Sequence, residues 1–215
     1  MWPALRPVYE TLRLTDGRRV TVRPVTATDR DDIQAFVRSL EPETRRRRYF
    51  LAIRELSAPM LDAITRPDPA REKVLVAVTG DDAQPRMVAL AQYAAADPEE
   101  DCEIALVLAD DTQGQGLGTR MMARLLDAAK VGGFRRAVGD VLRNNRAMIS
   151  LARRAGFEVA INAEDPDLVR IVRPLDERSR AVRPRVAELV QRGVDSLRSL
   201  ASRPQGTRSS GFEPA

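Results

Sequence analysis

Apolar residues along this chain follow two spacings: the alternation typical of strands, and the i, i+3, i+4, i+7 spacing typical of helices. Residues 28–31 have the composition of a helix start. The apolar residues that follow recur at helical spacing: Ile33, Phe36, Val37 and Leu40. Pro42 and Ser57 each begin a further short helical pattern. The first third of the chain therefore predicts three helices.

Strand patterns surround these helices. Alternating segments on both sides of Thr15-Asp16-Gly17 predict a β-hairpin over residues 8–14 and 18–25. Further strands are predicted at residues 73–78, 86–94, 102–109, 135–142, 158–162 and 168–173. Helices are predicted before Gly132-Gly133 and before Gly156-Phe157. This order indicates an α/β (α+β) fold with a single mixed central sheet and helices on both faces.

The chain divides into four parts by composition. Residues 1–15 form an N-terminal extension with the first hairpin strand, and residues 16–175 carry the folded domain. Residues 176–204 have an amphipathic pattern that predicts a C-terminal helical tail. Residues 205–215 are polar and rich in Gly, Ser and Pro, which predicts a disordered end.

The composition excludes several classes of site. The chain has no His and one Cys, which excludes His-based triads, disulfide frameworks and zinc sites built from His or thiolates, so we expect no metal. No apolar run approaches the roughly 18 residues of a membrane span, and the start lacks a signal-peptide pattern. We therefore expect a cytoplasmic protein without a membrane partner. A net charge of +4 with 4% aromatic residues argues against a nucleic-acid partner.

A glycine-rich segment between an apolar run at residues 104–108 and a helical pattern is the clearest chemical signal. Glycine lets a ligand approach the main chain, and the following helix directs free N–H groups and its positive dipole end at that ligand. This predicts an anion site, most simply for phosphates, although a plain strand-to-helix turn has the same composition. Its residues are Gln113, Gly114, Gln115, Gly116, Leu117, Gly118 and Thr119.

Two separated motifs resemble the Gcn5-related N-acetyltransferase (GNAT) superfamily. The glycine segment fits the family's acetyl-CoA loop, Gln/Arg-x-x-Gly-x-Gly/Ala, and an Asn-led helix from Asn145 to Gly156-Phe157 follows at the family's spacing. The N-terminal segments at residues 22–25, 40–45 and 48–50 resemble bacterial protein-lysine acetyltransferases, including those that silence acyl-CoA synthetases. The resemblance covers residues 16–175 and implies the GNAT acyl-CoA N-acyltransferase fold.

The resemblance implies acetyl-CoA as co-substrate and assigns its contacts. Main-chain N–H groups of residues 113–119 would hold the diphosphate. The strand containing Leu106, Val107 and Leu108 would splay from its neighbour, so that its free main chain pairs with the pantetheine arm. Asn145 would bond the pantetheine, cap its helix, or do both. Arg154 would reach a CoA phosphate or remain a plain surface arginine.

Glu103 is the candidate general base. Acyl transfer needs a neutral amine, and deprotonating an ammonium of pKa about 10.4 at pH 7 costs roughly 4.6 kcal/mol. Alternation along the strand puts Glu103 on the face opposite Cys102 and Ile104. If that face lines the cleft, burial would raise the pKa of Glu103 toward a useful value. The alternative is a solvated glutamate at a sheet edge.

Three other features bear on the chemistry. Many family members have a tyrosine, acting as general acid, where this chain has Ala152, so protonation of the departing thiolate has no assigned residue. The run Arg45 to Arg48 would steer an acidic protein or CoA phosphates, or form a solvated helix face with one arginine buried in an ion pair. Cys102 is expected to be a small core residue.

The sequence therefore predicts direct acetyl transfer from acetyl-CoA to an amine, most simply a protein lysine. Two alternatives stay open: a small-molecule amine as acceptor, and a non-catalytic module that senses acyl-CoA. The amphipathic tail would cover its own domain or a partner subunit, which makes a homodimer one expectation.

Overall fold

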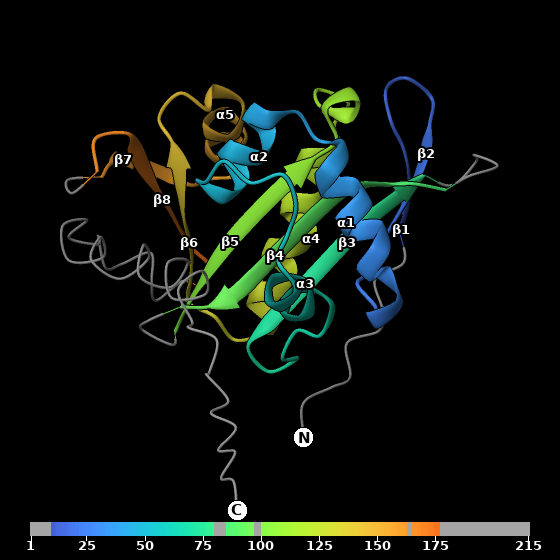
Figure 1. Cartoon of the computed structure of the whole chain (residues 1–215). Helices are drawn as coiled ribbons and strands as arrows, with labels where there is room; N and C mark the ends of the chain where they lie inside the picture. Colours follow the sequence, from blue (N-terminus) through green and yellow to red (C-terminus); the bar gives the residue numbers. More distant parts are fainter. Residues whose placement is uncertain (1–9, 80–84, 97–99, 163–164, 177–215) are drawn as a thin grey trace, which may run out of the picture.

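The computed structural model describes residues 10–79, 85–96, 100–162 and 165–176, which form an eight-stranded mixed sheet with helices on both faces (Figure 1). The sheet order is β1-β2-β3-β4-β5-β6-β8-β7. All neighbours pair antiparallel except β5 and β6, which are parallel. The strands are β1 Glu10–Arg13, β2 Arg19–Pro24, β3 Glu72–Thr79, β4 Met87–Ala95, β5 Asp101–Leu108, β6 Arg136–Leu142, β7 Glu158–Ile161 and β8 Leu168–Pro174.

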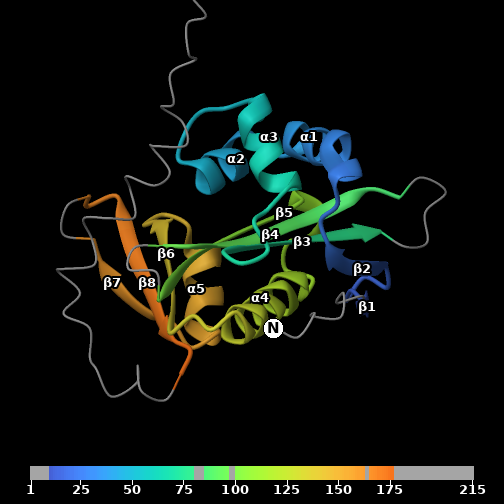
Figure 2. The same cartoon turned by 90° about the horizontal axis from the view of Figure 1, so that it is seen from below.

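Two layers of helices enclose the sheet. Figure 2 shows α1, α2 and α3 on one face and α4 and α5 on the other. Short 3-10 turns precede α1 and α4. The bounds are η1 Ala27–Asp29, α1 Arg30–Ser39, α2 Pro42–Tyr49, α3 Ala58–Thr65, η2 Asp110–Thr112, α4 Leu117–Val131 and α5 Arg146–Arg154. The predicted fold class is thus confirmed.

The apolar periodicities predicted these helices because the same residues face the core. Ile33, Phe36 and Val37 of α1 are buried. Buried apolar residues also recur along α4: Leu117, Met121, Met122, Leu125, Leu126 and Ala129. Such burial is the main source of stability for helices of this length.

The start of α1 differs slightly from the sequence expectation. The helix begins at Arg30, after a 3-10 turn, because the buried Asp29 carboxylate accepts hydrogen bonds from Thr26 N at 2.6 Å and from Arg23 at 2.6–2.7 Å. This ion pair ties β2 to the start of the helical layer. The pKa of Asp29 is lowered because these hydrogen bonds outweigh the opposing effect of its burial.

Cys102 lies in the core with no exposed surface, as predicted. Burial raises the pKa of its thiol to about 12, so it is not a nucleophile at neutral pH.

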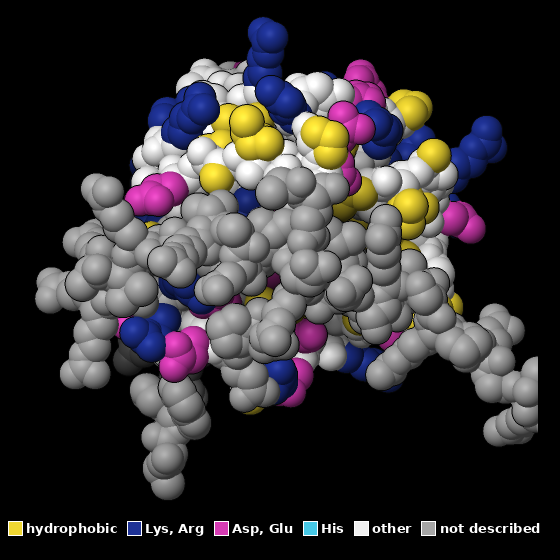
Figure 3. Space-filling model, turned by 90° about the vertical axis from the view of Figure 1, so that its left-hand side faces the viewer, with side chains coloured by type: hydrophobic (Ala, Val, Ile, Leu, Met, Phe, Trp, Pro, Cys, Tyr) yellow, Lys and Arg dark blue, Asp and Glu magenta, His cyan; other side chains and the backbone are white. Residues whose placement is uncertain are grey.

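Several expectations fall on residues outside the described ranges: residues 8–9 of the hairpin, the helical tail at 177–204 and the disordered end at 205–215. Within the described ranges, no helix has the length and apolarity needed to cross a bilayer. Seen from the side on which β7 and β8 lie in Figure 1, Lys and Arg side chains gather along the upper margin, with some Asp and Glu among them (Figure 3).

Candidate active site

The sheet opens between β5 and β6. Their parallel register consists of three pairs, from Asp101↔Arg136 to Glu103↔Val138. Beyond them, β5 stays paired with β4 as far as Leu108, while β6 pairs with β8 on its other side. The splay that the family resemblance implies is therefore present, and one edge of β5 faces a gap.

The main-chain groups of Leu106 and Leu108 point into this gap. Ala109 N donates to Val88 O on the β4 side at 2.8 Å. Because main-chain groups alternate in direction along a strand, those of Leu106 and Leu108 point away from β4. The carbonyl of Ile104 points the same way, since a Cβ added at Gly139 of β6 would lie 3.2 Å from Ile104 O. This edge of β5 can therefore pair with an extended ligand.

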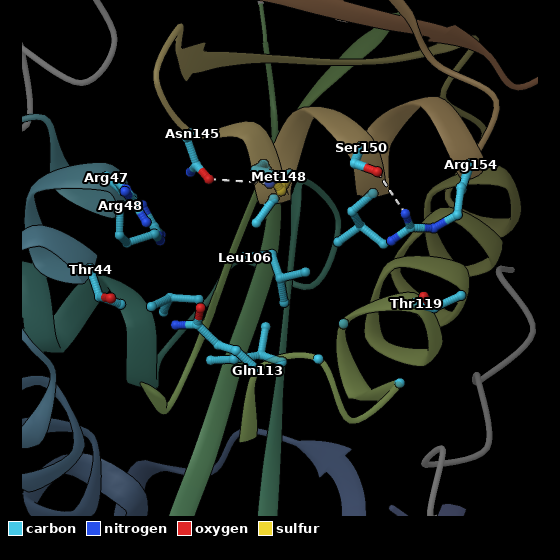
Figure 4. Close-up of a pocket in the computed structure, with 17 residues that line it drawn as sticks. Thr44, Arg47, Arg48, Leu106, Gln113, Thr119, Asn145, Met148, Ser150 and Arg154 are labelled. Atoms are coloured by element: carbon cyan, nitrogen blue, oxygen red, sulfur yellow. Dashed lines mark hydrogen bonds between the residues drawn. The ribbon is translucent and has the colours of Figure 1, made fainter. Parts of the chain in front are cut away.

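A cavity of about 380 Å³, the first cavity, lies along this edge (Figure 4). Most residues predicted to bind CoA line it: Leu106, Val107, Leu108, Gln113, Gly114, Gly116, Gly118, Thr119, Asn145 and Arg154. The side chains of Gln115 and Leu117 do not. Gln115 accepts a hydrogen bond from Thr15, and Leu117 is buried in the core. Any ligand contact of these two would be through the main chain.

The glycine segment adopts a conformation that other residues resist. Gly114 and Gly116 have φ values of +75° and +85°, in the left-handed region. Gly116 caps α4, and no side chain bonds the first N–H groups of that helix. The first turn also carries no acidic residue. The N–H groups of residues 117–119 are therefore available to an anion.

In Figure 4, Arg154 of α5 lies at the glycine end of the cavity, whereas Asn145, directly before α5, lies at the other end, on the side of Arg47 and Arg48. Arg154 Nη1 donates to Ser150 Oγ at 2.7 Å, which holds the guanidinium across from Thr119. Asn145 caps α5 by accepting from Met148 N at 3.1 Å through Oδ1, as predicted. Since the cap uses the oxygen, the amide nitrogen of Asn145 can still serve a ligand.

A second cavity of about 320 Å³ adjoins the first. The two share five lining residues, so they form one cleft: Arg47, Arg48, Leu106, Asn145 and Met148. Carboxylates of three strands line the second cavity: Glu72 of β3, Glu103 of β5 and Asp140 of β6. The site thus has an anion-binding end and an acidic end.

The carboxyl of Glu103 can exchange a proton near neutral pH. Burial raises its pKa to about 7, Arg170 and Arg48 oppose that rise, and Asp140 adds to it. Asp140 and Arg170 form a buried ion pair at 2.7 Å next to it, with side chains 6% and 4% exposed. Glu103 lines the cleft, which is the condition under which the sequence made it a candidate base, and its neighbour Ile104 lines the same cavity.

The four arginines of α2 make different contacts. Arg45 Nε donates to Ile53 O at 2.9 Å, while Arg46 and Arg47 pair with Glu43. Arg48 is buried, but the expectation of a buried ion pair is wrong within the described residues: its guanidinium lies over the Tyr49 ring, 4.8 Å from the centroid. Figure 4 shows Arg47 and Arg48 directed into the cleft.

Asp110 was missed by the sequence reasoning. Its Oδ1 accepts from Thr44 Oγ1 at 2.6 Å and from Gln113 Nε2 at 3.2 Å, and its Oδ2 accepts from Glu41 N at 2.8 Å. It thus joins α2 to the glycine segment. One feature of the sequence could have pointed to it: Asp110 lies shortly before the predicted anion site. A negative charge is unfavourable there unless it has a structural role.

Comparison with known proteins identifies similar chains. A family model described as "Acetyltransferase (GNAT) domain" matches residues 19–158. Acetyltransferase PA5475 of Pseudomonas aeruginosa is 37% identical over 154 residues, which cover 72% of this chain and 81% of that protein.

Two solved structures share the fold. The GNAT domain of PAT from S. lividans has a TM-score of 0.70 at 24% identity, covering 81% of this chain and 99% of that one. The putative acetyltransferase yncA from Salmonella typhimurium, solved with its cofactor acetyl-CoA, has a TM-score of 0.59 at 21% identity, covering 74% and 95%.

Proposed function

This chain belongs to the GNAT acetyltransferase family, and we propose that it transfers an acetyl group from acetyl-CoA to the side-chain amine of a protein lysine. The observation that carries this proposal is the continuity of the cleft, which runs from the glycine segment along the open edge of β5 to Glu103. An elongated thioester with a diphosphate at one end matches that layout.

The diphosphate would bind the N–H groups of residues 113–119, with Arg154 nearby. The pantetheine arm would then pair with the main chain of Leu106 and Leu108, in the manner of an added strand. Leu108 lies five positions after Glu103 along β5, which is roughly 16 Å at about 3.3 Å per residue. An arm extended along β5 would thus bring the thioester toward the base.

The chemistry would be direct transfer. Glu103 accepts a proton from the acceptor ammonium, directly or through one water, and the freed nitrogen attacks the thioester carbonyl carbon. A main-chain N–H at the Leu106 end of the Leu106–Leu108 segment would stabilise the tetrahedral oxyanion. The N–C bond forms, the C–S bond breaks, and the thiolate leaves with the electron pair. Holding both reactants in one cleft supplies much of the rate.

The proposal of a protein lysine rests on the N-terminal motifs, which resemble bacterial protein-lysine acetyltransferases. A small-molecule amine is the second candidate, favoured by the acidic lining of the second cavity, which would attract a free cationic substrate. Incubation with labelled acetyl-CoA and a cell lysate, then with a panel of small amines, separates the two. Label on proteins alone supports the proposal, and label on small amines alone refutes the lysine acceptor.

A further inference from the structure

Arg48 is a buried cation that forms no salt bridge in the described part of the chain, although it is close enough to Glu103 to affect the pKa of that carboxyl. The residue is 8% exposed and its Nε has no hydrogen-bond acceptor. Its neighbours on α2 differ, because Arg46 and Arg47 both pair with Glu43. An unpaired charge is costly to bury. A protein that retains one beside a cleft has a site ready for a negative charge.

The position of Arg48 indicates which negatively charged group it would bind. The residue lines both cavities and therefore lies where the anion-binding end meets the acidic end. It is close enough to Glu103 to lower the pKa of that carboxyl. The guanidinium lies over the Tyr49 ring, 4.8 Å from its centroid, and this contact holds it in place. The ring does not neutralise the positive charge, whereas a carboxylate would. The reacting thioester of the proposed function would lie at this junction.

Apart from Glu103, which takes the proton of the amine, the described residues of the cleft include no ordinary proton donor for the departing thiolate. Among the described residues that line the two cavities there is no Tyr, Cys, His or Lys. Ala152 has no exposed surface and no proton to give. The hydroxyl of Thr44 already donates to Asp110. The negative charge that develops on sulfur therefore needs a different stabiliser.

We propose that Arg48 is a catalytic residue that stabilises the departing CoA thiolate as an anion, so that no general acid is needed. This inference rests on the proposed function. As the C–S bond breaks, the electron pair passes to sulfur beside the guanidinium, while the proton of the amine stays on Glu103. The thiolate leaves unprotonated and takes a proton from water after release.

The first test measures the pKa of the thiol of bound CoA, the product. The complex is titrated with base, and the thiolate is detected by its ultraviolet absorbance. The complex with desulfo-CoA provides the baseline. A guanidinium in contact should lower the thiol pKa by about 1 to 3 pH units relative to free CoA. Arg47 is the other charged residue that lines both cavities; Glu72, Glu103 and Asp140 line the second cavity, and Arg170 pairs with Asp140. The carboxylates among them would raise the thiol pKa, so a fall points to an arginine.

Three variants test whether Arg48 causes the lower pKa of the bound thiol. Arg48→Met should return the thiol pKa to that of free CoA and lower kcat about 10²- to 10³-fold, the usual effect of removing one charge-stabilising donor. Arg48→Lys keeps the cation and should retain part of both effects. The matched control is Arg46→Met, on the same helix but outside both cavities, which should leave the thiol pKa and kcat unchanged.

The outcomes separate this inference from the proposed function. If the wild-type protein turns over but its bound thiol has the pKa of free CoA, or if Arg48→Met retains kcat, the inference is wrong. A rise confined to the KM of the acceptor would assign Arg48 to acceptor binding and also overturn it. A folded wild-type protein that neither binds CoA nor turns over would refute the proposed function itself.

Discussion

Replacing Glu103 by Gln should lower activity and raise stability at the same time. The substitution keeps the shape of the side chain but removes its ability to accept a proton. General-base catalysis contributes about 10²- to 10⁴-fold, so kcat should fall by that factor, while acetyl-CoA affinity should stay within about threefold of wild type. The assay is release of free CoA, with calorimetry for affinity.

The stability gain follows from the raised pKa of Glu103, from 4.5 to about 7. The folded state binds this proton more tightly than the unfolded state, so the contribution of Glu103 is most favourable below about pH 4.5 and is lost as pH rises through 7. Above pH 7 the ionised carboxylate costs up to about 3 kcal/mol, at about 1.4 kcal/mol per pH unit. Glu103→Gln, which is neutral at every pH, should therefore unfold at a higher temperature than wild type at pH 8.

The same pKa determines the pH profile. Wild-type kcat/KM should rise as Glu103 ionises, with a midpoint near pH 7, and Glu103→Gln should show no such rise. A variant with near-normal turnover, or one less stable than wild type at pH 8, would refute this assignment. Misfolding alone cannot give the expected pair of results, because it lowers stability as well as activity.

Three further substitutions test the supports of the site. Gly116→Val places a β-branched residue at a φ of +85° and should weaken CoA binding at least tenfold by calorimetry; unchanged binding would remove the glycine segment from the site. Asp110→Ala frees Gln113 and Thr44 and should raise the KM for acetyl-CoA several-fold, whereas a change in melting temperature alone would make Asp110 merely structural. Asn145→Ala removes the cap of α5 and should lower the free energy of unfolding by about 0.5–2 kcal/mol in urea titrations, with Asn145→Asp expected to retain most of it.

The fold could be predicted because its signals are local. The six buried apolar residues of α4 repeat within one helix, and Thr15-Asp16-Gly17 forms the turn of its own hairpin. Glu103 could be placed on β5 for the same reason, since the pattern that predicts a strand is a property of that one segment.

The rest could not be predicted because it depends on distant pairings. Asp110 bonds Thr44 and Glu41, which are 66 and 69 residues away along the chain, and no pattern in the sequence records such contacts. The burial of Arg48 likewise depends on how α2 packs over β5 rather than on its arginine run.

The central claim is that main-chain amides following β5 bind the diphosphate of CoA. Calorimetry with CoA and with pantetheine, which lacks the diphosphate, tests it most directly. We expect CoA to saturate one site per chain and pantetheine to bind at least tenfold more weakly. Equal affinity for the two, or no binding of CoA to the folded protein, would contradict the claim.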